Sequence, residues 1–271
     1  MKQNPPLVLL TDFGLTDAYA GLLRAVILSI HPQASILDLT HGIRPQDVLQ
    51  GALILESSYR FFPSGSIFVC VVDPGVGTGR KILCARTGNY YFIGPDNGIL
   101  ALALEHEPKE EIRSVENKRF FLRAVPSSTF HGRDIMSPAA AHLALARSCG
   151  RDIFHQLGPS LQKFHPALFS KPRKIRDGLE GRILYFDHFG NAVTSLHRRD
   201  EKAAFWEKAQ VRVGEMDLGP LRKTYGAGPE TLAALFNSFD RLEIAMPGGS
   251  AKECGPLEAG ETVRVSPIKA R

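Results

Sequence analysis

The sequence predicts an α/β N-terminal domain with a mainly parallel, layered sheet, followed by a smaller all-β C-terminal domain. In the first half, short apolar runs alternate with segments of helical apolar spacing, and such alternation builds parallel sheets covered by helices. After about residue 170, short strand patterns follow one another closely between glycines and prolines, which is typical of a small barrel or sandwich. We therefore expect two domains, residues 1–170 and 171–271.

The N-terminal elements follow from apolar spacing. Helices are expected over residues 17–30, 46–57, 99–104 and 137–147. Strands are expected over residues 7–10, 35–39 and 67–72, with a hairpin formed by 81–85 and 90–93.

The C-terminal part contains only short strand candidates. They cover residues 179–186, 192–196, 210–213, 242–245 and 261–265. A stretch rich in Pro, Lys and Arg, residues 166–177, precedes them and looks like a linker between the two domains.

Composition excludes several classes of protein. The 271 residues are 44% hydrophobic and 23% charged, as in soluble globular proteins. No run approaches the ~20 apolar residues of a membrane helix, and the N-terminus has no signal-peptide pattern, so we expect a cytoplasmic protein without a membrane partner. The net charge of +5 suggests an anionic partner, but the basic residues are dispersed, so nucleic acid is not expected. The four cysteines lack metal-ligand spacing, so no metal site is expected.

Two motifs place an acid, a guanidinium and an imidazole within reach of one site. The segment DPGVGTGR, residues 73–80, follows an apolar strand, so Asp73 lies at the strand's carboxyl end and Arg80 ends a glycine-rich loop. Ligands bind at such strand ends in α/β sheets. The segment STFHGRD, residues 128–134, contributes His131. Together the three side chains could hold and activate a small polar nucleophile.

Structural interpretations of these residues remain open at this point. Asp73 and Arg80 could form an ordinary surface ion pair, which contributes little to stability. His131 could belong to a polar network with its neighbours Thr129, Arg133 and Asp134.

Asp12 ends the first predicted strand, just before Gly14. A carboxylate there could accept hydrogen bonds from the two hydroxyls of a ribose, or it could cap the helix that follows. The segment GPDNG, residues 94–98, is expected to be a turn in which Asp96 or Asn97 caps a helix.

Polar side chains in the C-terminal part form two further candidate groups. Asp187 and Asn191 flank a turn in DHFGN, and they could bind an ammonium and a carboxylate or simply shape a hairpin. Asn237 and Ser238 precede a strand that contains Glu243. A glutamate in an apolar strand usually faces solvent, and otherwise needs a polar ligand.

Taken together, seven ordered segments resemble the S-adenosyl-L-methionine (SAM) hydroxide adenosyltransferases, the adenosine-forming SAM hydrolases related to fluorinase and chlorinase. The resemblance covers nearly the whole chain. Its segments are residues 11–14, 41–52, 73–80, 94–98, 130–134, 187–191 and 237–245.

The resemblance implies a C-terminal β-barrel and a homotrimer whose active sites lie between the N-terminal domain of one subunit and the C-terminal domain of the next. It assigns the catalytic set to Asp73, Arg80 and His131 and the ribose-binding acid to Asp12. Further groups for adenosine and methionine fall on Asp187, Asn191, Asn237, Ser238, Glu243, Ala245 and Met246.

The implied reaction is attack of water or hydroxide on the ribose C5′ of SAM, which gives adenosine and methionine without a cofactor. Three positions differ from the halogenases: Asp73 replaces an aromatic residue, Gln46 a tryptophan and Phe239 an arginine. The insertion typical of the fluorinase is also missing. A carboxylate near the nucleophile disfavours a halide, although a halide-using transferase and a non-catalytic SAM or adenosine sensor stay open as alternatives.

Overall fold

The structure, a computed structural model, describes residues 4–169 and 171–268. The chain divides into two compact units, Met1–Leu168 and Phe169–Arg271. The expected domain boundary at residue 170 lies outside the described residues. Each unit has its own sheet and its own apolar core.

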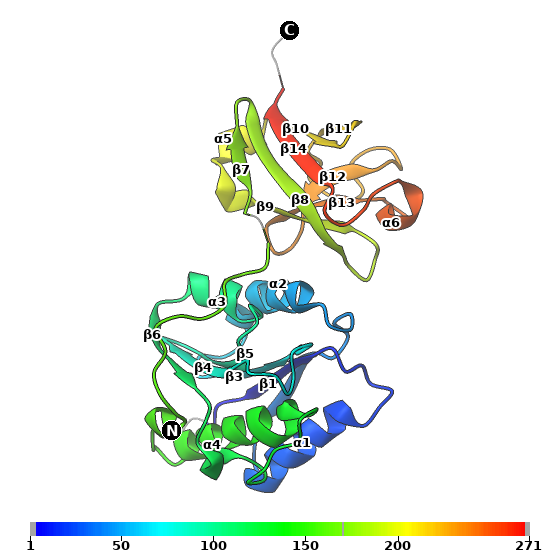
Figure 1. The fold of residues 1–271 in the computed structure, drawn as a ribbon. Helices are drawn as coiled ribbons and strands as arrows, with labels where there is room; N and C mark the ends of the chain where they lie inside the picture. Colours follow the sequence, from blue (N-terminus) through cyan, green and yellow to red (C-terminus); the bar gives the residue numbers. More distant parts are fainter. Residues whose placement is uncertain (1–3, 170, 269–271) are drawn as a thin grey trace. The chain divides into compact units, whose positions relative to one another are not determined.

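The N-terminal unit contains a six-stranded sheet in the order β2-β1-β3-β5-β4-β6 (Figure 1). The strands are β1 (Leu7–Thr11), β2 (Ile36–Thr40), β3 (Ile67–Val71), β4 (Ile82–Thr87), β5 (Tyr91–Pro95) and β6 (Lys109–Ser114). Strands β2, β1, β3 and β5 run parallel, while β4 is antiparallel to both β5 and β6. The sheet is therefore mixed and mainly parallel, as the sequence predicts.

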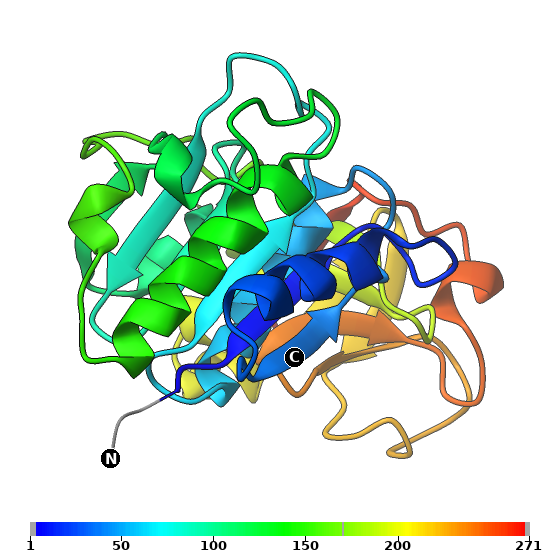
Figure 2. The ribbon, with the colours of Figure 1, turned by 90° about the horizontal axis from the view of Figure 1, so that it is seen from below.

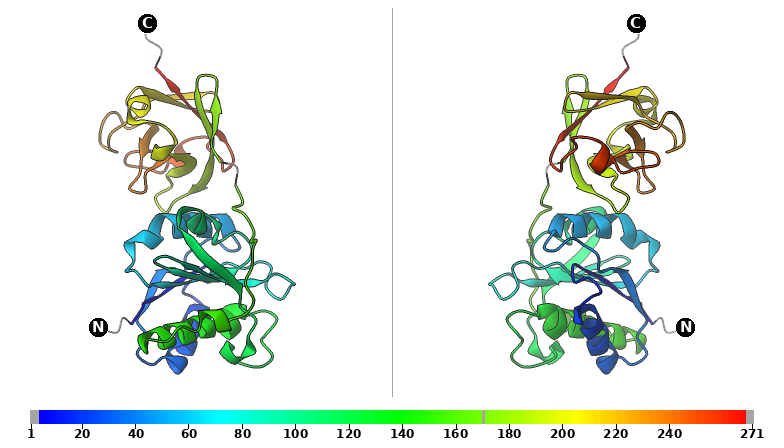
Figure 3. Two further views of the ribbon diagram at one scale, coloured as in Figure 1. Left: turned by 90° about the vertical axis from the view of Figure 1, so that its left-hand side faces the viewer. Right: turned by 90° about the vertical axis from the view of Figure 1, so that its right-hand side faces the viewer.

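Helices cover both faces of this sheet. They are α1 (Tyr19–Ile30), α2 (Val48–Ser58), α3 (Ala101–His106) and α4 (Ser137–Ser148), with a π-helical turn at Gly132–Met136. Helices α1 and α4 lie side by side on one face, and α2 and α3 cover the other (Figures 2 and 3). Alternate residues of β1 enter the two cores: Leu7 and Leu9 face α1 and α4, while Val8 and Leu10 face α2.

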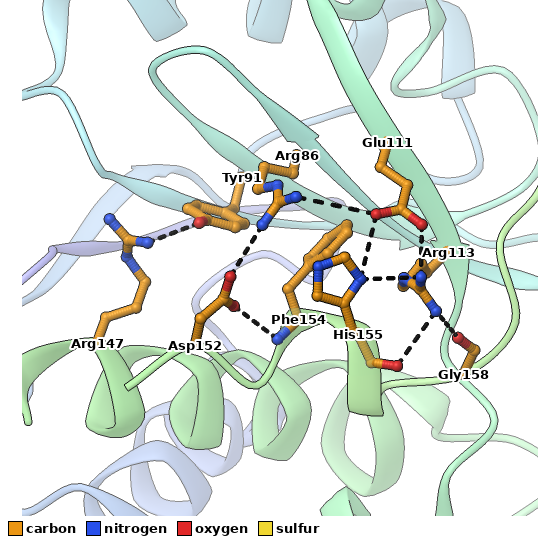
Figure 4. A network of polar contacts seen from close by, with 9 residues as sticks. All are labelled: Arg86, Tyr91, Glu111, Arg113, Arg147, Asp152, Phe154, His155 and Gly158. Carbon is orange, nitrogen blue, oxygen red and sulfur yellow. Dashed lines mark hydrogen bonds and ion pairs between the residues drawn. The ribbon is translucent and has the colours of Figure 1, made fainter. Parts of the chain in front are cut away.

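A polar network attaches the segment after α4 to the sheet (Figure 4). Arg86 of β4 forms an ion pair with Asp152 at 2.9 Å and lies 4.6 Å from the ring centre of Phe154. Arg113 of β6 pairs with Glu111 at 2.5 Å. Charges that pair and stack on an aromatic ring in this way hold the connecting segment against β4 and β6.

The C-terminal unit is a nearly closed antiparallel barrel in the order β11-β10-β14-β8-β9-β13-β12, with β7 paired to β8. The strands are β7 (Arg173–Ile175), β8 (Gly178–Phe186), β9 (Ala192–His197), β10 (Ala209–Val213), β11 (Met216–Pro220), β12 (Ala233–Phe236), β13 (Arg241–Ala245) and β14 (Thr262–Pro267). Two short helices, α5 (Ala203–Trp206) and α6 (Ala251–Cys254), lie between them. The implied barrel is therefore confirmed.

Four strands were missing from the sequence prediction. They are β6, β7, β11 and β12. Strand β7 lies inside the stretch interpreted as a linker, so that interpretation of residues 166–177 is wrong for its C-terminal part. No helix in the described ranges 4–169 and 171–268 is long and apolar enough to cross a membrane.

Candidate active site

The candidate active site of the N-terminal unit lies at the carboxyl ends of two neighbouring strands. In the parallel register of β1 and β3, Thr11 is opposite Val71, so Asp12 and Asp73 emerge at the same edge of the sheet. Both line a cavity of about 640 Å³. His131 lines the same cavity.

Asp73, Arg80 and His131 form one connected group. Arg80 Nε donates to Asp73 Oδ1 at 2.8 Å, and its Nη2 pairs with Asp73 Oδ2. The same Nη2 lies 2.9 Å from His131 Nδ1. The side chains of Arg80 and Asp73 are only 10% and 5% exposed, so this is not the surface ion pair left open above. His131 bonds to Arg80, while the neighbouring Asp134 is occupied by other partners.

The contact with Arg80 determines which ring nitrogen of His131 carries the proton. A guanidinium can only donate, so Nδ1 of the ring must be the acceptor and the proton of the neutral imidazole lies on Nε2. Burial, and then the positive charge of Arg80, lower the pKa of His131. The site therefore contains a neutral histidine that offers an N–H donor beside a cation and a carboxylate.

Two glycines let the loops of the site approach each other. Gly77 has a positive φ of 79°, and a side chain there would clash with the carbonyl oxygen of Ser128. The loop after β3 thus lies against the loop that precedes His131 (Figure 2). At Gly132, a Cβ would lie 3.0 Å from Val71 of β3. This close packing brings His131 to the end of the strand that positions Asp73.

Asp12 does not cap the following helix. Helix α1 begins at Tyr19, and its N-cap is Ala18, without a side-chain hydrogen bond. Oδ2 of Asp12 instead accepts a hydrogen bond from Gln46 N–H at 2.8 Å. Gln46 has φ of +66°, a left-handed backbone that a residue with a side chain adopts only at a cost. The cap interpretation is therefore wrong, and the carboxylate lies in the cavity.

Sequence reasoning missed an aromatic group in the cavity wall. The rings of Phe13, Tyr19 and Phe130 lie with centroids 5.4 to 5.7 Å apart. Asn97 has a structural role close by: its Nδ2 donates to Val72 O at 2.8 Å, and its Oδ1 accepts from Ile99 N–H. It lies in the turn before α3, but it does not cap that helix.

In the C-terminal unit, Asp187 and Asn191 shape the turn between β8 and β9. Oδ1 of Asp187 accepts from the backbone N–H of Phe189 and Asn191, each at 2.9 Å, and Oδ2 accepts from Asn191 Nδ2 at 3.1 Å. These contacts confirm the hairpin interpretation of the two residues, and their role in binding stays a prediction. Their position beside β13 also brings them near Glu243.

Glu243 does not face solvent. It is 1% exposed on β13, opposite Val193 of β9, and accepts a hydrogen bond from the Tyr225 hydroxyl. Burial raises its pKa, the nearby Asp187 adds to this effect, and hydrogen bonds from Tyr225 and Asn237 act against it. Tyr225 belongs to this polar cluster, but no sequence pattern in its Gly-rich loop pointed to it.

The remaining C-terminal candidates have less distinctive surroundings. Ser238 is exposed in the turn between β12 and β13, Ala245 is buried at the end of β13, and Met246 is half-buried after it. The roles that the resemblance gives to these side chains stay predictions. Within residues 4–169 and 171–268, no cluster of three or more His, Cys, Asp or Glu has the arrangement of a metal site.

The chain combines a mainly parallel α/β unit, which contains an Asp-Arg-His set, with a β-barrel unit that has its own polar cluster. The sequence profile of the SAM hydroxide adenosyltransferase N-terminal domain matches residues 7–158, and that of the C-terminal domain matches residues 181–264. The chain belongs to this family, and the resemblance noted from its motifs is confirmed.

Individual relatives agree with this assignment. A Thermus thermophilus protein named (R)-S-adenosyl-L-methionine hydrolase is 37% identical over 96% of this chain and 99% of its own. A protein named fluorinase from an Actinoplanes species is 30% identical over 97% and 98%. Crystal structures of an uncharacterized conserved protein from Thermotoga maritima and a conserved hypothetical protein from Thermus thermophilus superpose with TM-scores of 0.85 and 0.78. Their identities to this chain are 32% and 34%, and each pair covers 96% of this chain and 99% of the other.

Proposed function

We propose that this protein is a SAM hydrolase that forms adenosine and L-methionine. The observation that carries the proposal is the connected Asp73–Arg80–His131 group, of which Asp73 and His131 line the cavity that Asp12 also lines. The name of the Thermus relative supports the same reaction. It also specifies the R form of SAM, so we propose that form as the substrate.

In this reaction the oxygen of water or hydroxide attacks C5′ of the ribose, and the C5′–S bond breaks. The bonding electrons pass to the sulfonium, which leaves as the neutral thioether of methionine. Because a sulfonium is a good leaving group, the protein chiefly needs to hold the nucleophile in line with that bond, at about 3–3.5 Å. Arg80 and the Nε2–H of His131 supply two donors to an oxygen nucleophile.

If the nucleophile is water, its proton needs an acceptor. Nδ1 of His131 is occupied by Arg80, and Nε2 already bears a hydrogen, which leaves Asp73 as the acceptor within the group. Each carboxylate oxygen has a second lone pair beyond the one used by Arg80. The negative charge of Asp73 also disfavours a halide in the same position, which argues against a halide-using transferase.

Asp12 would hold the substrate through the ribose hydroxyls. In the C-terminal unit, Asp187, Asn191, Asn237, Ser238 and Glu243, with the backbone of Ala245 and Met246, would hold the adenine and methionine portions. We further propose that the two units are the functional domains and that the chain forms a homotrimer. One subunit would supply the N-terminal half of each site and its neighbour the C-terminal half, as the family resemblance implies. No cofactor is required by this scheme.

Product analysis tests the proposal. Purified protein is incubated with each sulfonium epimer of SAM in ¹⁸O-labelled water, and the products are separated and weighed by mass spectrometry. We expect adenosine with the label in its 5′-hydroxyl, together with methionine, and faster turnover of the R form.

The same assay separates the alternatives. It is repeated at high fluoride, chloride and bromide, where a main product of 5′-halo-5′-deoxyadenosine would contradict hydrolysis. A protein that binds SAM without consuming it would favour the sensor. Asp73→Asn, which keeps the shape of the side chain and removes its charge, serves as the matched control for the proton acceptor.

A further inference from the structure

A polar network, buried at Thr11 and His41 and partly exposed at Asp38 and Arg24, contacts the turn that carries the ribose-binding candidate Asp12. His41, 5% exposed, follows β2. Its Nδ1 lies 2.8 Å from the hydroxyl of the buried Thr11, and its Nε2 lies 3.0 Å from Asp38 Oδ1. Arg24 of α1 pairs with Asp38, and its Nη2 also lies 3.2 Å from His41 Nε2. None of these four side chains belongs to the catalytic or binding set described above.

The charge of Asp38 sets the direction of the hydrogen bonds. Burial alone would raise the pKa of Asp38, but hydrogen bonds from Arg24 and His41 outweigh it and leave the pKa below its ordinary value. An ionised carboxylate only accepts. Nη2 of Arg24 also lies 3.2 Å from Nε2, but it pairs more closely with Asp38 Oδ2, and Asp38 Oδ1 is nearer to Nε2 at 3.0 Å. Nε2 of His41 therefore carries the hydrogen and donates it to Asp38. In the neutral ring, Nδ1 must then accept from the Thr11 hydroxyl. That oxygen is left to accept from the Phe13 N–H, which lies 3.2 Å away.

The network ends on the two backbone N–H groups that follow Asp12. The Thr11 hydroxyl holds the N–H of Phe13, the next residue after Asp12. The carbonyl oxygen of His41 accepts from Gly14 N–H at 2.8 Å. His41 thus fixes the turn at residues 11–14 through its ring and through its backbone. Only the ring contact depends on the type of side chain.

We propose that His41 is a positioning residue for ribose binding, which it supports by orienting the Thr11 hydroxyl and thereby the turn that carries Asp12. This inference rests on the proposed function, since it requires Asp12 to bind the ribose. It predicts that the Nδ1 contact governs substrate affinity, whereas the Nε2 contact with Asp38 does not. A merely structural role would make both contacts matter in the same way.

Two substitutions separate the contacts. His41→Asn places an amide oxygen near the position of Nδ1 and keeps an acceptor for Thr11, while His41→Gln reaches toward Asp38 and leaves Thr11 without one. We expect His41→Gln to weaken adenosine binding by about 3- to 10-fold, the effect of one lost hydrogen bond. We expect KM for SAM to rise in parallel, kcat to change by less than about twofold, and His41→Asn to retain wild-type affinity.

A second pair of substitutions changes Thr11, the other partner in the hydrogen bond with His41 Nδ1. Thr11→Val removes the hydroxyl at nearly constant volume and should reproduce the loss of affinity, whereas Thr11→Ser keeps the hydroxyl and should not. Adenosine Kd is measured by calorimetry and folding by Tm. This pair decides the question if either His41 variant fails to fold.

The outcomes are distinguishable. Equal adenosine affinities of folded His41→Asn and His41→Gln, or of Thr11→Val and Thr11→Ser, overturn the positioning role and leave the hydrolase assignment intact. Loss of kcat without a change in Kd or KM also overturns it. A wild-type protein that neither binds adenosine nor cleaves SAM overturns the proposed function and this inference together.

Discussion

At the scale of single residues, the proton on His131 governs the proposed chemistry. Its pKa is lowered from the ordinary 6.5 because burial and the Arg80 cation both oppose a second positive charge. The neutral ring therefore persists to lower pH than in an exposed histidine. Protonation would leave Nδ1 unable to accept from Arg80, so the group would lose the contact that joins it.

The pH dependence of the reaction should reflect this shift. Neutral His131 is the competent form, so kcat/KM falls as pH drops through the folded-state pKa. We expect the midpoint of the acidic limb below pH 6.5. The ring titration of His131, followed by NMR and assigned with a His131→Gln variant, should give the same midpoint. A midpoint of the acidic limb above pH 6.5 would mean that Arg80 does not lower the pKa of the ring as inferred.

Residue patterns alone located part of the site. Asp12 and Asp73 were predictable because each follows an apolar strand, and the carboxyl ends of neighbouring parallel strands meet at one edge. The burial of Glu243 was not, because a strand pattern cannot tell a solvent-facing glutamate from one held by a distant tyrosine. Tyr225 and His41 act through partners 18 and 30 residues away, beyond the reach of local spacing.

At the scale of elements, the loop after β3 and the loop before His131 depend on Gly77. Gly77→Ala places a methyl group against the Ser128 carbonyl and strains a backbone with φ of +79°. The loops must separate, which moves Arg80 away from His131. Because a displacement of about 1 Å in a reacting set can cost on the order of 10²-fold in rate, we expect a large fall in kcat.

Gly79→Ala is the matched control for that substitution. A Cβ at Gly79 meets nothing within 4 Å, and its φ lies outside the left-handed region. The two variants are compared by kcat, adenosine Kd and Tm. Equal effects of both substitutions on kcat would show that the packing of Gly77 on Ser128 does not align the set.

Elements that the sequence left unpredicted have a common physical reason. Strand β12, Ala-Ala-Leu-Phe, has no β-branched residue, and β6 begins with three charged residues; both sequences have the intrinsic preference of a helix. Pairing with β13 and β4 makes them strands. Where apolar periodicity was strong, as in α1 and β3, the predicted bounds differ from the observed ones by at most two residues.

At the scale of the whole molecule, the candidate groups divide between the two units. The nucleophile-holding set and Asp12 belong to the N-terminal unit, and the cluster of Asp187, Asn191 and Glu243 belongs to the C-terminal unit. Neither set contains the donors and acceptors for a complete SAM molecule. The family resemblance is the ground for proposing a trimer, and this division is what makes the proposed assembly testable.

Complementation between two inactive chains tests that assembly. Asp73→Ala disables the N-terminal half of a site and Asn191→Ala the C-terminal half. If each site draws its halves from neighbouring subunits of a closed ring, random mixing at equal amounts gives two intact halves in about one quarter of the sites. Co-expressed chains carrying different affinity tags are purified through both tags, and SAM hydrolysis is measured per subunit. Tandem purification removes the unmixed trimers, so the recovered fraction of activity should lie somewhat above one quarter.

Each chain expressed alone is the control for this experiment and should stay inactive. If both halves came from the same subunit, every site would carry one lesion, so mixed trimers without activity would contradict the shared site.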